Sequence, residues 1–92
     1  MTEQLFLLKT LSQSNHKNRK LLFQYLRLFY NQKYSIFRVS KFAKTMQITY
    51  ISAFNLCNTL LFKTGFFVKD ANGFYEPTTD TLTALNEVFG NE

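Results

Sequence analysis

The chain has 92 residues and an apolar fraction of 46%, which suits a single folded domain rather than a disordered segment. With one cysteine, one histidine and no glycine-rich phosphate loop, we expect no internal disulfide, no metal site, no cofactor and no enzymatic activity. The sequence has no run of about 18 apolar residues and no secretory-signal layout, so we expect a cytoplasmic protein without a membrane span.

The net charge is +5, but the charges are segregated along the chain. No Asp or Glu occurs from Gln4 to Lys69, and all 11 Lys and Arg residues lie in that span. A solvated surface normally mixes both signs, because like charges repel one another. A polyanion is the simplest counter-charge, so the pattern predicts nucleic-acid binding. A general bias toward basic composition and binding to an anionic membrane surface are the alternatives.

Residues 2–13 predict a short helix that is apolar over most of its circumference. Leu5, Leu8 and Leu11 recur in it at a spacing of three. A terminal segment so apolar must bury itself either on its own domain or on a second copy of the chain. We favour a second copy, which makes these leucines predicted dimer contacts.

The next helix is predicted over residues 16–31, with Ser14 or Asn15 as its cap. Its apolar face should form the floor of the core and contains Leu22, Leu26 and Phe29. Its first turn carries cations where the helix dipole favours carboxylates, namely Lys17, Arg19 and Lys20. A nearby phosphate backbone would make this cluster favourable, whereas an exposed and salt-screened turn is the alternative.

Residues 34–37 predict one short strand, and residues 38–47 predict a helix of two to three turns. The helix should pack through positions i, i+3, i+4 and i+7, which are Val39, Phe42, Ala43 and Met46. Its outer side carries Arg38, Lys41 and Lys44.

Residues 48–65 predict a further helix that begins at Thr49 as N-cap and ends at Gly65 as a left-handed residue. Its packed face is expected to hold Ile51, Phe54, Cys57 and Leu61, with Cys57 as a buried thiol. Its opposite face holds Ser52, Asn55, Thr59 and Lys63. Amide and hydroxyl side chains without a carboxylate suit the polar edges of bases, which predicts a DNA recognition helix. An ordinary surface helix is the alternative.

The segment after Gly65 predicts a hairpin and a last helix. Asn72-Gly73 between two aromatic segments favours a tight turn, and Pro77 should end the second strand. A cap is available from Thr78 to Asp80. The last helix is expected to use Leu82, Leu85, Val88 and Phe89.

From about residue 17 to residue 78 the chain resembles the winged helix-turn-helix family. The resemblance lies in the closely joined helix pair, in the passage LFKTGFF from Leu61 to Phe67, and in the return strand NGFYEPT from Asn72 to Thr78. The chain is most similar to small PadR-type and MarR-type regulators and to compact winged-helix proteins of archaeal plasmids and viruses. This resemblance implies a mainly α fold with a small β-hairpin wing (α+β), in which a three-helix core is flanked by terminal helices.

The chain is then expected to be one domain, residues 1–92. It would have an N-terminal helix within 1–14, a winged-helix core over 16–78 and a C-terminal helix over 79–92.

The resemblance also implies roles for individual residues. The recognition helix would enter the major groove with Thr49, Tyr50, Ser52, Asn55 and Thr59 as base-contacting positions, and Asn55 as the residue for a bidentate contact to adenine. The phosphate-contacting positions would be Lys17, Arg19, Lys20, Arg38, Lys41, Lys44 and Lys63, with Lys69 and Asn72 at the wing. The terminal helices would form a dimer through Leu5, Leu8, Leu11, Leu85 and Phe89.

We therefore expect a homodimer that binds double-stranded DNA with some sequence preference. Its role would be transcriptional repression, or marking a DNA site for a second protein as the site-binding component of a plasmid partition system does. The alternative is a winged-helix module for protein–protein interaction. An interaction module has no need for a long cationic span without acids, so the charge pattern favours DNA.

Overall fold

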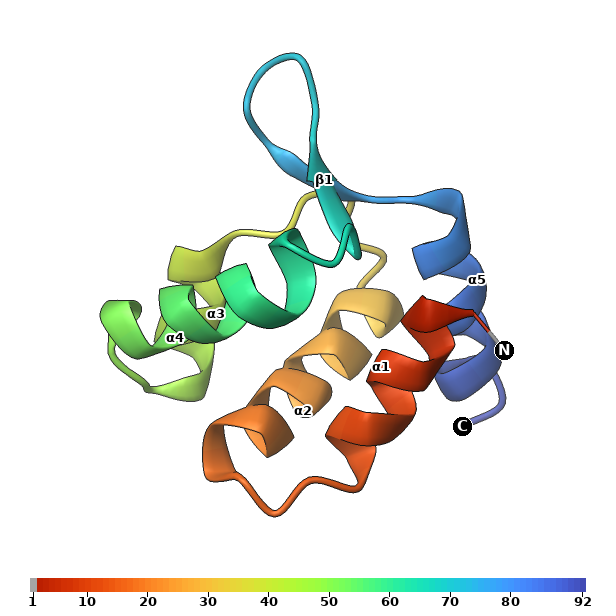
Figure 1. The fold of residues 1–92 in the computed structure, drawn as a ribbon, viewed down its shortest axis with the longest axis horizontal. Coiled ribbons are helices and arrows are strands. Elements are labelled where there is room, and N and C mark those ends of the chain that lie inside the picture. Colours follow the sequence, from red (N-terminus) through yellow and green to blue (C-terminus); the bar gives the residue numbers. More distant parts are fainter. Residues whose placement is uncertain (1) are drawn as a thin grey trace.

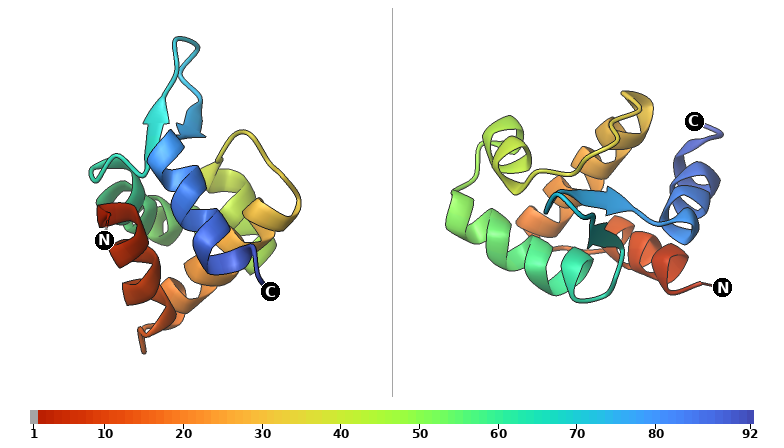
Figure 2. Two further views of the ribbon diagram at one scale, coloured as in Figure 1. Left: turned by 90° about the vertical axis from the view of Figure 1, so that its right-hand side faces the viewer. Right: turned by 90° about the horizontal axis from the view of Figure 1, so that it is seen from above.

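The computed structural model describes residues 2–92, which form a mainly helical α+β fold with a two-stranded antiparallel sheet. In chain order the elements are α1 (Glu3–Ser12), α2 (Lys17–Asn31), α3 (Val39–Met46), α4 (Tyr50–Cys57), the π-helical turn η1 (Asn58–Phe62), β1 (Phe67–Lys69), β2 (Tyr75–Pro77) and α5 (Thr79–Phe89). Figure 1 shows α3 and α4 together on one side of α2, and α1 beside α5 on the other side, near both chain ends. The hairpin loop projects away from the helices, as Figure 1 and the left view of Figure 2 show. The mixed, mainly helical class predicted from the sequence is confirmed.

Helix α2 forms the floor of the core, as its apolar periodicity predicts. Leu22, Tyr25, Leu26 and Phe29 are buried along one face of it. The ring of Phe29 packs edge-on against that of Phe67 at 5.3 Å between centroids, which ties the floor to the first strand. Such offset aromatic contacts add to the stabilisation that burial alone provides.

Helix α1 packs on its own domain, which corrects the predicted dimer contact. Leu5, Leu8 and Leu11 are buried in a single copy of the chain, where α1 lies against α2 and α5. Leu85 and Phe89 of α5 are buried in the same core. These five side chains are at most 8% exposed in a single copy, so they leave little surface for a second copy, and the structure does not support their assignment as dimer contacts. Burial on its own domain is the other option that the apolar sequence of α1 allows, and the position of α5 beside α1 agrees with it.

The helix starts follow the capping predictions in two of three cases. The hydroxyls of Thr49 and Thr78 accept hydrogen bonds from the backbone N–H groups of Ser52 and Thr81, so both threonines cap their helices. Helix α2 instead has His16 at its N-cap and no side-chain cap bond. Ser14 and Asn15 lie too early in the chain to cap that helix, and the Ser14 hydroxyl accepts from the N–H of His16 at 3.1 Å. The cap predicted for α2 is therefore wrong.

The strand predicted over residues 34–37 is reduced to a single bridge. The N–H of Phe37 donates to the carbonyl of Tyr75 at 2.9 Å, and this pair is an isolated antiparallel bridge beside the sheet. Tyr34 turns its ring edge toward Phe29 at 6.1 Å between centroids. Packing of that ring in the core is compatible with a bent segment rather than a strand.

The predicted hairpin is present, with Val68 opposite Glu76 in the register of β1 and β2. The strand β2 ends at Pro77 as expected. The Asp70 carboxylate accepts from the N–H groups of Asn72 and Phe74 at 2.8 Å and 2.9 Å, which orders the loop. Among residues 2–92, the positive φ angles include Gly73 at 83° but not Asn72, so the turn is longer than a two-residue Asn-Gly turn.

Candidate nucleic-acid interface

A short turn joins α3 to α4 and fixes the direction of α4. Gln47 ends α3 in the left-handed region at φ 58°, and Thr49 begins the next helix. The hydroxyl of Thr49 accepts from the N–H of Ser52 at 3.2 Å and donates to the Ser52 hydroxyl at 2.9 Å. Thr49 was predicted to contact bases, but its hydroxyl already serves this cap. Its clearest role is to position the first turn of α4.

The packed face of α4 differs from the one predicted. Ala53, Cys57 and Leu61 are fully buried, whereas Ile51 is 72% exposed and Phe54 is 42% exposed. The prediction for Cys57 and Leu61 is confirmed, and that for Ile51 and Phe54 is wrong. The small side chains of Ala53 and Cys57 let α4 approach the core closely, which leaves the larger apolar residues outside.

The helix predicted to reach Gly65 changes its winding after Cys57. In η1 the N–H of Lys63 donates to the carbonyl of Asn58 at 3.0 Å, a bond five residues apart that defines a π turn. The wider turn brings the Phe62 ring onto that of Tyr75, with 3.7 Å between centroids and 7° between planes. The end of the helix is thereby stacked on the hairpin. Gly65 has φ 77°, the left-handed conformation expected for it.

Three predicted base-contacting residues share an open groove with the start of α2. This polar groove has a volume of about 440 Å³. It is lined by Ser52, Asn55 and Thr59 on the α4 side and by His16, Asn18 and Arg19 on the α2 side. Its only charged lining residue is a cation, Arg19. The groove can therefore offer amide, hydroxyl and guanidinium donors to one anionic ligand.

Tyr50, also predicted to contact bases, lies in a different groove. This aromatic groove has a volume of about 260 Å³ and runs between the start of α3, the start of α4 and the hairpin loop. Tyr50 and Phe54 line it from α4, Ser40 from α3, Arg38 from the N-cap position of α3, and Phe74 from the loop. At 100° per residue, Ile51 falls between the faces of α4 that line the two grooves. The predicted site is thus divided into two parts that flank one exposed helix face.

Most of the cations remain free of carboxylates. Within residues 2–92, the only ion pair joins Arg27 Nε to Glu92 Oε1 at 2.8 Å. The predicted phosphate-contacting residues other than Arg19 are exposed, namely Lys17, Lys20, Arg38, Lys41, Lys44, Lys63, Lys69 and Asn72. Lys41 holds its Nζ 3.8 Å from the centroid of the Tyr34 ring, so this side chain is directed toward the loop before α3. An uncompensated cationic surface of this kind attracts polyanions.

Several residues at the two grooves were not predicted from the sequence to belong to a site. His16 and Asn18 line the polar groove, and Phe54 and Phe74 line the aromatic one. The spacing of four between Tyr50 and Phe54, with the small Ala53 beside them, was the signal that could have identified an aromatic outer face.

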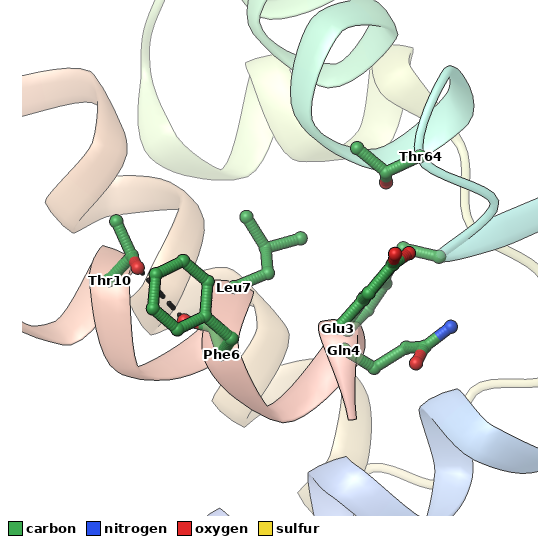
Figure 3. A pocket seen from close by; sticks show the side chains of 7 residues that line it. Glu3, Gln4, Phe6, Leu7, Thr10 and Thr64 are labelled. Atoms are coloured by element: carbon green, nitrogen blue, oxygen red, sulfur yellow. Dashed lines mark hydrogen bonds between the residues drawn. The ribbon is translucent and has the colours of Figure 1, made fainter. Parts of the chain in front are cut away.

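A third pocket lies between α1 and the turn that precedes β1, and it has a different character. Its volume is about 250 Å³, and Phe6, Leu7 and Phe66 contribute its apolar lining. Figure 3 shows Phe6 and Leu7 from α1 facing this space together with Thr64. Its one charged lining residue is Glu3, so it offers no cation to an anion.

Burial keeps the single cysteine unreactive. The Cys57 side chain is fully buried, and this burial raises the pKa of its thiol to about 12. The thiol is therefore neutral at physiological pH and acts as a small apolar group, as predicted. Among residues 2–92, no three His, Cys, Asp or Glu side chains gather where they could hold a metal ion. In the same part of the chain, no helix has both the length and the apolar character needed to cross a membrane.

Comparisons with models of protein families, with curated proteins and with solved structures give no match.

Proposed function

We propose that this chain is a winged-helix protein that binds double-stranded DNA, with α4 as the recognition helix and the β1–β2 hairpin as the wing. The observation that carries the proposal is the exposed polar face of α4, which lacks carboxylates and is bordered by cations without partners. Of the 11 Lys and Arg residues, only Arg27 is paired with a carboxylate among residues 2–92. The order of elements, with a short turn between α3 and α4 and a hairpin after them, supports the winged-helix assignment.

In this proposal α4 lies in the major groove, which admits one α-helix. The Asn55 amide pairs with the N6 and N7 edge of adenine, while Ser52 and Thr59 contact neighbouring bases or phosphates. Ile51, at 72% exposure the most exposed of the large apolar side chains, suits contact with a thymine methyl group.

The proposed phosphate contacts lie on both sides of this helix. Arg19 belongs to the polar groove, and with Lys17 and Lys20 it forms a cationic first turn of α2. Lys44 is exposed in the last turn of α3, and Lys63 is exposed just after η1. Lys69 and Asn72 would reach the adjacent minor groove or its phosphates from the hairpin. Each cation that neutralises a phosphate contributes to the salt dependence of binding.

A homodimer is part of the proposal, since paired copies double the number of contacts on a symmetric site. The dimer contact must be formed by residues other than the buried leucines. Phe6 is 64% exposed on the outer side of α1 and lies beside the apolar pocket of Figure 3, which makes it the best candidate. The role of such a dimer would be repression, or marking a DNA site for a second protein.

The second candidate function is protein–protein interaction without specific DNA binding. The exposed apolar side chains of Ile51, Phe54 and Phe74 favour it, because they gather around one end of α4 and the hairpin loop. The excess of cations without a carboxylate partner among residues 2–92 is what makes DNA the first choice.

The test is a binding titration on genomic duplex fragments from the source of the protein. Random duplex and single strand serve as competitors, at two salt concentrations about fourfold apart. We expect one fragment to bind about a thousandfold more tightly than random duplex, with affinity falling steeply as salt rises. The genes beside that fragment would then separate repression from partition. Equal and weak binding to every nucleic acid would contradict the proposal and favour a protein partner.

A further inference from the structure

The aromatic groove exposes several aromatic rings that contacts with the base edges of an intact duplex do not require. We propose that it accepts an unpaired nucleobase, so that the preferred substrate is a duplex carrying an unpaired nucleotide rather than a fully paired one. This inference rests on the proposed DNA-binding function and narrows its substrate class.

The first wall of the groove is a pair of parallel rings on α4. Tyr50 and Phe54 lie one helical turn apart, with 6.2 Å between ring centroids and 21° between ring planes. Tyr50 is 55% exposed, and Phe54 is 42% exposed. Exposed aromatic rings in a nearly parallel arrangement provide a face on which a planar base can stack, whatever its sequence.

The other wall comes from the hairpin loop and the start of α3. Phe74 is 41% exposed and has the Arg38 guanidinium 5.5 Å from its ring centroid. A guanidinium stacked over a ring also offers its edge to a phosphate or to the acceptor atoms of a base. The stacked rings of Phe62 and Tyr75 belong to the same groove, so aromatic surface continues between the two walls.

The charges around the groove favour a nucleotide over an apolar protein segment. Arg38 is its only charged lining residue, and Ser40 and Tyr50 add hydroxyl groups. No carboxylate lines it. An apolar peptide would use the rings but would leave the guanidinium without a counter-charge, whereas a nucleotide supplies both a planar ring and a phosphate. The groove also flanks the same helix that we propose for the major groove, so a base displaced from the bound duplex has a short path to it.

The experiment compares two duplexes of one sequence, one fully paired and one with a single unpaired 2-aminopurine, whose fluorescence falls when it stacks on a ring. We expect the wild-type protein to bind the unpaired duplex about tenfold more tightly and to quench its fluorescence. Phe74→Ala and Tyr50→Ala should each reduce both the preference and the quenching. Phe74→Trp should retain the preference and the quenching, because the larger ring still stacks on a base. This result would also show that the loop tolerates substitution at this position.

Leu82→Ala is the matched control, since it removes an exposed apolar side chain on α5 outside the groove and should leave the preference unchanged. If the wild-type protein bound both duplexes with equal affinity and without quenching, this inference would be overturned. The proposed DNA-binding function would still be supported by that affinity for the duplex. Equal loss on both duplexes for Phe74→Ala would also overturn it, because the groove would then belong to the duplex interface. No binding to either duplex would overturn both proposals.

Discussion

The hydroxyl of Thr81 donates a hydrogen bond to the backbone carbonyl of Phe66 across 2.5 Å, and the Thr81 side chain is fully buried. The same hydroxyl accepts from that of Thr78 at 3.0 Å, while the Thr78 oxygen accepts the N–H of Thr81. The start of α5 and the residue before β1 are therefore held together by a closed set of polar contacts. This set fixes the root of the hairpin against the helical core.

Replacement of Thr81 by Val tests this anchor. The change keeps the shape of the side chain but leaves the buried carbonyl of Phe66 without its donor, so the free energy of unfolding should fall by about 1–3 kcal/mol. Thr83→Val is the matched control, because the Thr83 hydroxyl donates to a carbonyl of its own helix on the exposed side. It should change stability by less than about 0.5 kcal/mol. Urea denaturation of both variants gives the comparison, and equal losses would contradict the role of the anchor.

The local features of the fold were predictable because they depend on a few adjacent residues. Thr49 and Thr78 cap helices with their own hydroxyls, and Gly65 and Gly73 adopt positive φ angles, which glycine reaches more readily than residues with a Cβ atom. Apolar periodicity likewise identified the buried face of α2. Caps, left-handed glycines and apolar periodicity each depend on residues within one or two helical turns of one another, so the sequence alone reveals them.

The predictions that were wrong concern features that depend on contacts with elements on the other side of the core. The periodicity of α4 fits two different packed faces, and the closeness of the neighbouring helices selects the one with Ala53 over the one with Phe54. The same reason applies to Leu8, whose burial against its own domain depends on where α5 returns. The division of the candidate site into a polar and an aromatic groove follows from these choices, so it too was out of reach of the sequence.

Truncation of Leu8 should weaken folding without changing the oligomeric state. Leu8 is fully buried, so Leu8→Ala should lower the free energy of unfolding by about 2–5 kcal/mol through lost burial and a residual cavity. Sedimentation should give the same mass for this variant as for the wild-type protein. Phe6→Ser is the contrasting variant, which should lower the mass if Phe6 forms the proposed dimer contact. A monomeric Leu8→Ala variant with wild-type stability would restore the contact predicted from the sequence.

Stability should fall at alkaline pH because two buried groups resist ionisation in the folded state. Burial raises the pKa of Cys57 from 9.0 to about 12 and is also the main reason that the pKa of Tyr25 rises from 10.0 to about 12. Well below pH 9 both groups are protonated in the folded and in the unfolded chain, so the stabilisation that they provide is fully present. As pH rises from 9 toward 12, the unfolded chain loses these protons first, and the free energy of unfolding decreases by at most about 1.4 kcal/mol per pH unit for each group.

Two variants separate these contributions in urea denaturation between pH 8 and pH 11. Cys57→Ala should flatten the decline that begins near pH 9, and Tyr25→Phe should flatten the decline that begins near pH 10. Both comparisons are made against the wild-type protein at the same pH, which cancels the effects of pH that all three proteins share. Parallel curves for all three proteins would show that neither group stays protonated in the folded state.

Asn55 and Lys44 should affect DNA binding in different ways. Asn55 lies in the polar groove of α4 and would read one base pair, so Asn55→Ala should reduce discrimination at that base pair by about 1–3 kcal/mol and leave binding to random duplex nearly unchanged. Lys44 is exposed at the end of α3 and would contact a phosphate, so Lys44→Ala should weaken all sequences alike and lower the slope of log affinity against log salt by about one.

Lys9→Ala is the control for net charge, because it removes an exposed cation from the last turn of α1 and should leave the salt slope as it is. The measurement is a titration of specific and random duplexes at several salt concentrations. Equal losses on specific and random duplexes for Asn55→Ala would remove that residue from the base-reading set. Equal changes of slope for Lys9→Ala and Lys44→Ala would mean that the salt dependence of DNA binding follows the overall charge of the protein rather than a defined phosphate contact at α3. The proposed orientation of α4 in the major groove would then lose its support.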